Sequence, residues 1–129
     1  MNPIQSDDYE DMAATYQVML IHWLNDAFKD AKVTDKEMIR KVVNNFFMSM
    51  GTFTDQYWFA DTEGNRVYPC ICFSKAGPAA DTELDQHKDV HFPSKFFSWQ
   101  EYAMSNVDHY FDEMHEDVKE IPHSLEAPE

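Results

Sequence analysis

The sequence predicts an α+β domain in which three amphipathic helices pack on a small antiparallel sheet, in the order ααββα. Three observations support this class. Apolar residues recur at three- and four-residue steps in three long segments. Two short runs between residues 56 and 74 are rich in aromatic and β-branched residues and flank the turn sequence TEGN. With 129 residues, 43% of them hydrophobic, the chain has enough apolar side chains for one core.

The first two helices are expected in the first half of the chain. Periodic apolar residues predict a helix over residues 7–31, with Ser6 as its N-cap. The sequence TDKE at 34–37 is a capping box, in which the threonine accepts the amide three residues on and the glutamate reaches back. This second helix is expected to end at Gly51, because glycine is the usual residue just after a helix C-terminus.

The sheet is expected as a β-hairpin near residues 56–74. Pro69 cannot donate a hydrogen bond to a neighbouring strand, which places the second strand at an edge or at a bulge. Residues 74–93 show no periodicity and are interpreted as a long loop. Because two strands alone make a weak sheet, either a third strand within this segment or an unusual dominance of the helices is expected. A third helix begins at the capping box SWQE (98–101) and ends at Pro122.

The chain is predicted to form a single acidic domain over residues 1–121, followed by a flexible C-terminal tail at 122–129. Its 24 acidic and 10 basic residues give a net charge of −14. Such a chain repels nucleic acid and anionic membranes and attracts basic partners. The charge is uneven: residues 1–35 hold seven acids and two bases (−5), 36–75 hold four and five (+1), and 76–129 hold thirteen and three (−10).

Several features indicate a cytoplasmic protein, expected to be a monomer or a weak dimer. The N-terminal sequence MNPIQSDDYED has neither the basic nor the apolar region of a secretory signal. The most apolar run, VMLIHWL at 18–24, is too short to span a bilayer. Cys70 and Cys72 are interpreted as reduced, buried thiols, because a disulfide across a single residue would be strained.

The sequence contains no catalytic motif, and we expect no catalytic residue, metal or cofactor. It has no G-x-S-x-G sequence and no glycine-rich phosphate loop. The two cysteines lack the second pair that a structural zinc site needs. His87 and His91 lie one turn apart only if their segment is helical, and Asp112 with His115 supplies only half of a di-iron motif. A metal-dependent enzyme that uses these four residues is kept as a third alternative.

Residues 108–120, DHYFDEMHEDVKE, contain six carboxylates and one lysine. On a helix, the carboxylates form two exposed rows: Asp108, Asp112, Glu116 and Glu120, and beside them Glu113 and Asp117. Four like-charge pairs one turn apart destabilise an isolated helix by about 1–2 kcal/mol together, which a positive partner would relieve.

A second acidic cluster lies at the start of the first helix and consists of Asp7, Asp8, Glu10 and Asp11. The acids Asp81, Glu83, Asp85 and Asp89 of the 74–93 segment extend it. We predict that the ten carboxylates of the two clusters bind a basic partner.

In size, acidity and the carboxylate rows of SDDYED and DHYFDEMHEDVKE, the chain resembles the bacterial and phage DNA-mimic proteins. Carboxylates one helical turn apart are about 5–6 Å from each other, so that their rows imitate the phosphates of DNA, which rise by about 3.4 Å per nucleotide. The resemblance implies a non-enzymatic protein that occupies the DNA-binding site of a restriction enzyme, a repressor or, as our first expectation, a nucleoid protein of the histone-like HU type. The near-neutral middle segment departs from this pattern.

The main alternative is a cytosolic immunity or inhibitor protein that neutralises a nuclease-type toxin. Such a protein is also acidic, but a few anchor residues, often exposed Tyr or Trp, carry its binding.

Overall fold

The computed structural model of the chain describes residues 2–77, 89–114 and 117–122. The elements follow in the order β1 (Asn2–Ser6), α1 (Tyr9–Asp30), α2 (Lys36–Gln56), β2 (Phe59–Ala60), β3 (Arg66–Val67), β4 (Asp89–Pro93) and α3 (Trp99–His109). A π-helical turn (Tyr110–Met114) continues α3, and a 3₁₀ turn (Asp117–Glu120) comes later. The fold is therefore mixed α+β, as the sequence predicts.

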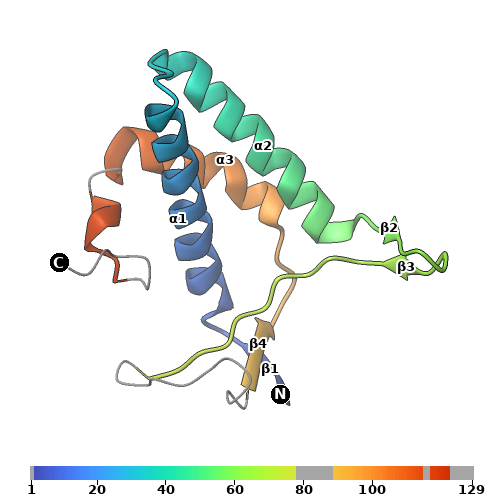
Figure 1. Cartoon of the computed structure of the whole chain (residues 1–129). Coiled ribbons are helices and arrows are strands. Elements are labelled where there is room, and N and C mark those ends of the chain that lie inside the picture. Colours follow the sequence, from blue (N-terminus) through green and yellow to red (C-terminus); the bar gives the residue numbers. More distant parts are fainter. Residues whose placement is uncertain (1, 78–88, 115–116, 123–129) are drawn as a thin grey trace.

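The strands form two separate two-stranded sheets. β1 and β4 pair in parallel, with Asn2 opposite Asp89 and Ser6 opposite Pro93. β2 and β3 pair antiparallel over two residues each and form an arm that projects away from the helices (Figure 1). The order expected from the sequence contains neither β1 nor a parallel pair. The third strand expected within 74–93 is present as β4, but it pairs with β1, and Phe73 joins it through a bridge to His91.

The hydrophobic core lies among the three helices rather than between the helices and a sheet. Its buried members come from α1 (Val18, Ile21), from α2 (Ile39, Val43, Phe47) and from α3 and the turns after it (Ala103, Val107, Tyr110, Val118). A smaller cluster of Tyr9, Ala13 and Trp99 joins the start of α1 to the start of α3. Each amphipathic helix buries its apolar stripe against the others, so that the short sheets add little to the core.

Two helix starts differ from the expected ones. Ser6 belongs to β1 and is not the N-cap of α1, which is Asp8. The Ser6 hydroxyl instead donates to the Asp8 carboxylate. Asp35 caps α2 in place of Thr34, because Asp35 has the extended backbone of an N-cap and its carboxylate accepts the Met38 amide at 3.1 Å.

Gly51 does not end α2, which continues to Gln56. A Cβ atom at Gly51 would lie 2.6 Å from the Gln100 nitrogen and 2.9 Å from the Trp99 carbonyl carbon. The glycine therefore allows the backbones of α2 and α3 to approach closely, which is a packing role rather than a stop signal.

The third helix is shorter than expected. Ser98 is its N-cap, as the SWQE motif predicts, and its hydroxyl accepts the Glu101 amide at 3.2 Å. Regular α-helix ends at His109, where the π-helical turn begins, instead of running on toward Pro122.

Cys70 and Cys72 are exposed and free, so the expectation that they are buried is wrong. They lie in the extended segment between β3 and Phe73, outside both hydrophobic clusters.

Within the described part of the chain, none of the helices combines the length and the hydropathy that a membrane crossing requires.

Candidate acidic interface on α3

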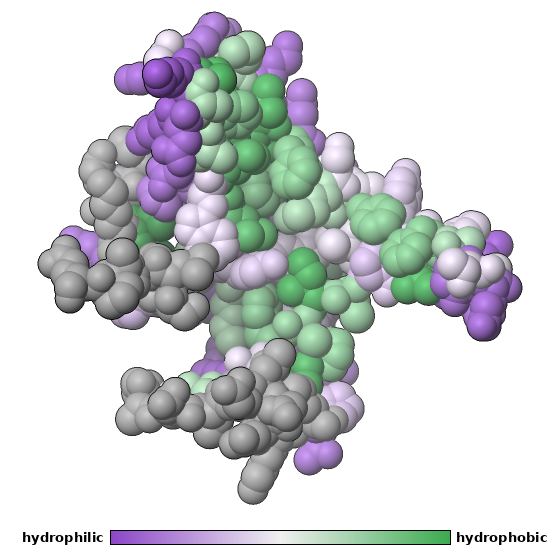
Figure 2. Space-filling view, viewed as in Figure 1, coloured by the Kyte–Doolittle hydropathy of each residue, from purple (hydrophilic) through white to green (hydrophobic). Residues whose placement is uncertain are grey.

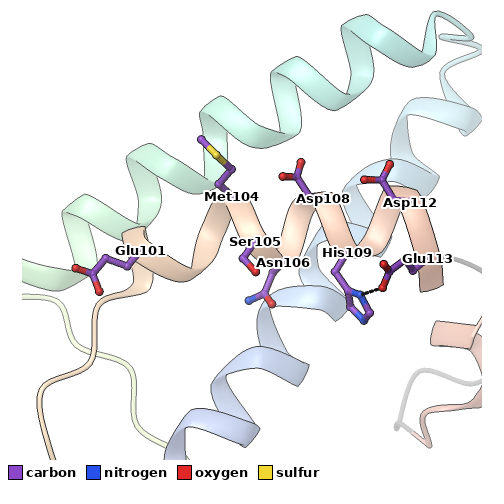
Figure 3. Close-up of a pocket in the computed structure, with 8 residues that line it drawn as sticks. All are labelled: Glu101, Met104, Ser105, Asn106, Asp108, His109, Asp112 and Glu113. Atoms are coloured by element: carbon purple, nitrogen blue, oxygen red, sulfur yellow. Dashed lines mark hydrogen bonds and ion pairs between the residues drawn. The ribbon is translucent and has the colours of Figure 1, made fainter.

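The exposed side of α3 lines an open concavity of about 730 Å³. Four carboxylates line it, from Glu101, Asp108, Asp112 and Glu113, and no Lys or Arg is among its described lining residues. Figure 3 shows Asp108 and Asp112 on the side of α3 toward α2, and His109 and Glu113 on the other side. We call this surface the α3 acidic face.

A side chain from α2 helps to hold the start of α3 in place. The carboxylate of Asp55 accepts hydrogen bonds from the Ser98 hydroxyl at 2.8 Å, the Trp99 amide at 2.7 Å and the Gln100 amide at 3.1 Å. The Ser98 hydroxyl in turn accepts the Glu101 amide. Three of the amides that a helix N-terminus leaves without an intrahelical partner are thus satisfied, two of them from another helix.

The two carboxylates on the α2 side are paired with an arginine. Arg40 of α2 donates to Asp108 at 2.7 Å and to Asp112 at 2.8 Å, and its guanidinium lies 5.9 Å from the centre of the Phe111 ring. The hydrogen bond from Arg40 lowers the pKa of Asp112 below its usual value of 3.8. Because Arg40 sits between the two carboxylates, it relieves the repulsion between Asp108 and Asp112, one of the four like-charge pairs predicted from the sequence.

The second row runs along the α1 side of α3. His109 Nδ1 lies 2.8 Å from the Glu113 carboxylate, and 69% of the Glu113 side chain is exposed. On this side the Glu113 carboxylate therefore faces solvent, with a histidine as its neighbour. Glu101 stands in the first turn of α3, seven positions before Asp108 and so near the same side of the helix, where the helix dipole favours a negative charge.

The four acids of the N-terminal cluster differ in their partners. Asp7 accepts the Ser94 hydroxyl at 2.7 Å, and Asp11 is exposed in the first turn of α1. Asp8 pairs with Lys75, which, together with Ser6, lowers the pKa of Asp8 to about 2. Glu10 accepts the hydroxyl of Tyr102 on α3, and this hydrogen bond raises the pKa of Tyr102.

The Glu10–Tyr102 contact places the N-terminal cluster at one end of the α3 acidic face. Further along the same two helices, the Asn106 amide donates to Gln17 at 2.5 Å, so α1 and α3 run in the same direction. Tyr102, Asn106 and His109 follow one stripe of α3 at helical spacing, and His109 contacts Glu113. Glu10 and His109 therefore mark the two ends of one edge, about 10 Å apart along the helix for the seven residues from Tyr102 to His109 at about 1.5 Å each.

The regular α-helix on which the predicted rows depend does not run through residues 108–120. The chain leaves it at Tyr110, where the π-helical turn begins. Glu116 lies outside the described residues, Asp117 begins the 3₁₀ turn, and Glu120 ends that turn as an exposed residue.

The other candidate residues lie in β4 or outside the described residues. Asp81, Glu83, Asp85, His87 and His115 lie outside the described residues, and Asp89 lies in β4. His91, also in β4, exchanges backbone hydrogen bonds with Phe73. Within the ranges that the structure describes, no three His, Cys, Asp or Glu side chains are grouped so as to hold a metal ion.

Sequence reasoning missed Arg40 and Asp55, which position the face, and also Phe96. Phe96 is 87% exposed and lines a second concavity of about 230 Å³ together with Asp7, Glu10 and Tyr102. No local pattern marks Arg40 and Asp55, because their partners are far away in the sequence, and none marks the exposure of Phe96.

Comparisons of the chain with protein-family models, with curated proteins and with solved structures found no match.

Proposed function

We propose that the chain is a non-enzymatic DNA mimic, whose α3 acidic face binds the DNA-binding surface of a basic protein and blocks or regulates its binding to DNA. A nucleoid protein of the HU type is the first candidate partner, followed by a restriction enzyme or a repressor. The observation that carries the proposal is the group of four carboxylates on the exposed α3 acidic face, with Glu10 beside the start of that face.

The charge of this face supports attraction to a cationic surface. Four carboxylates and the one guanidinium of Arg40 leave a formal charge of −3 when His109 is neutral. Charge of this kind accelerates association with a basic partner and is screened by salt.

The rigidity of the face supports it as well. Arg40 holds Asp108 and Asp112 one helical turn apart, and Asp55 holds the start of the helix. Because these carboxylates are already ordered, less entropy is lost when a partner binds them.

The proposal is tested by titrating the purified chain with an HU-type protein at about 50 and about 200 mM salt. We expect affinity to fall steeply with salt and double-stranded DNA to compete with the chain. An affinity that does not change over this range would exclude a phosphate-mimicking surface.

Charge reversals on the face sharpen the test. Glu101→Lys and Glu113→Lys should each weaken binding two- to fivefold, or about 0.5–1 kcal/mol, and the double variant should lose the product of the two factors. Glu63→Lys makes the same charge change in the turn of the β2–β3 arm and is the matched control. An equal loss in all three variants would show that only the net charge matters.

The inhibitor alternative rests on one specific observation, the exposure of Phe96 beside Asp7 and Glu10. An aromatic side chain exposed in this way is suited to fill a pocket on a partner as an anchor. If Phe96→Ala weakens binding of a nuclease-type toxin more than about 30-fold, or 2 kcal/mol, while Glu101→Lys has little effect, the inhibitor function is favoured.

A further inference from the structure

One side of α2 carries large apolar side chains that the fold leaves exposed. We call them the α2 stripe: Met38 (49% exposed), Val42 (43%), Phe46 (52%) and Phe53 (38%). At about 100° per residue, these four positions fall within an arc of about 80° around the helix. The stripe is distinct from the core-facing residues Ile39, Val43 and Phe47, which are buried.

The apolar surface continues from α2 onto the β2–β3 arm. The rings of Phe53 and Phe59 stack, with 6.1 Å between their centres and 8° between their planes. The guanidinium of Arg66 covers the Trp58 ring at 4.3 Å. Figure 2 shows apolar residues along the visible face of α2 and on the arm. An exposed apolar surface of this extent usually marks an interface.

We propose that this surface binds a second copy of the chain in a two-fold symmetric, antiparallel pairing of α2 with α2. The spacing of the stripe supports the symmetry. A two-fold axis beside Phe46 brings Met38 of one copy opposite Phe53 of the other, because these residues lie eight positions before and seven positions after Phe46. The same surface then serves both copies, as an isologous interface requires. The inference does not depend on the proposed function.

The charge pattern favours the antiparallel direction. Without Arg40 and Asp55, which face α3, residues 29–41 around the start of α2 hold four bases and three acids, whereas residues 55–66 at its end and on the arm hold two acids and one base. Antiparallel pairing brings the +1 end of each copy to the −1 end of the other. Each copy has a net charge of −14, so the two copies repel each other as a whole. The repulsion is weakest at α2 and the arm, because residues 36–75 have a net charge of +1.

The size of the surface requires the arm as well as the helix. α2 has 21 residues and is about 31 Å long, so a stripe about 10 Å wide covers about 300 Å². A stable interface buries about 800 Å² on each partner. In the antiparallel pairing, Tyr57 and Trp58 reach the other copy's turn between α1 and α2 and supply further area.

The proposed dimer leaves the α3 acidic face exposed. Arg40, which points from α2 to Asp108 and Asp112, lies at least about 120° around the helix from every residue of the α2 stripe. The two surfaces therefore face different directions.

Sedimentation equilibrium of the full chain over about 1–300 μM tests the proposal, with the expectation that the mass approaches that of two chains. Phe46→Asp should raise the dimer dissociation constant at least tenfold, because each dimer carries the change twice near the axis. Ser105→Asp adds the same charge on the α3 acidic face and should leave the constant within about threefold. A wild-type chain that stays monomeric at all concentrations, or an equal effect of both variants, would overturn the proposal.

A cross-link tests the position of the axis separately. In a background of Cys70→Ser and Cys72→Ser, Phe46→Cys should form an intermolecular disulfide under mild oxidation, because the two Cβ atoms meet near the axis. Ser105→Cys in the same background is the matched control and should remain a thiol. A disulfide only in the control would place the contact on α3 and refute the α2 interface. Failure of both variants to cross-link, despite a dimer in solution, would refute the position of the axis.

Discussion

Replacing Gly51 by alanine tests the close crossing of α2 and α3. The new Cβ would lie 2.6 Å from the Gln100 nitrogen, 2.8 Å from its Cα and 2.9 Å from the Trp99 carbonyl carbon. All three are backbone atoms, so no rotation of a side chain removes the clash. Alanine is favoured over glycine inside a helix by about 1 kcal/mol, whereas overpacking costs about 1–3 kcal/mol. Because the backbone must move, we expect the upper end of that cost and a net destabilisation of about 2 kcal/mol.

The assay is thermal and urea unfolding of the variant beside the wild type. A loss of about 2 kcal/mol corresponds to a fall in Tm of about 6–10 °C for a domain of this size. Ser105→Ala is the control, because it changes an exposed helical position and should gain up to about 0.5 kcal/mol from helix propensity alone. If Gly51→Ala also becomes more stable, α2 and α3 are farther apart than the structure places them and the reasoning is refuted.

Three further substitutions test the contacts that hold the helices and the acidic face. Asp55→Ala should lower the free energy of unfolding by about 1–3 kcal/mol and speed hydrogen exchange of the amides at the start of α3. Unchanged exchange at these amides would show that Asp55 does not cap the helix. Tyr110→Phe should lower the free energy of unfolding in urea by about 1–2 kcal/mol, because the buried Tyr110 hydroxyl lies 2.7 Å from His22 Nδ1 and accepts the Asn25 amide at 3.1 Å. A neutral change would show that these two hydrogen bonds together add nothing. Arg40→Gln should raise the pKa of Asp112 toward 3.8 in an NMR titration. Because the pKa of Asp112 is lower in the folded than in the unfolded chain, the ion pair stabilises the fold at pH values above the unfolded-state pKa. Wild type should therefore be more stable than Arg40→Gln near neutral pH, and this difference should vanish as the pH falls through the folded-state pKa of Asp112. A difference that persists at still lower pH would implicate another interaction.

The helices were predictable because their signals are local. Apolar residues at helical spacing and the Ser98 cap act within a few residues of the chain, and the structure contains all three helices. The end of α2 was mispredicted because glycine has two different uses. At Gly51 its small size permits the approach of another helix, and a single sequence does not distinguish this from a stop.

The sheets were only partly predictable because strand pairing depends on residues far apart. β1 finds its partner 87 residues later in β4, and its five-residue sequence has no alternating pattern that marks it as a strand. β2 and β3 lie within the segment where strands were expected, but each has only two residues. The helices therefore supply most of the packing that was assigned to a sheet.

The acidic face was predictable in its exposure but not in its charge balance. Helical periodicity places Asp108 and Asp112 on the solvent side, and the structure places them there. Their common partner, Arg40, precedes them by 68 and 72 residues, a separation at which no local pattern operates. The pairing of charges across helices is a tertiary property, which only the fold reveals.

The cap that Asp55 places on α3 links the acidic face to the stability of the whole domain. A helix of 11 residues is too short to be stable alone in water, so α3 forms only where α2 and the core support it. A peptide of this segment should therefore be unfolded, although it carries the same charges. The reverse also follows: a partner that binds only the folded face stabilises the domain, by about 2.7 kcal/mol at a free concentration 100 times its Kd. A rise in Tm on mixing would therefore reveal such a partner without any label.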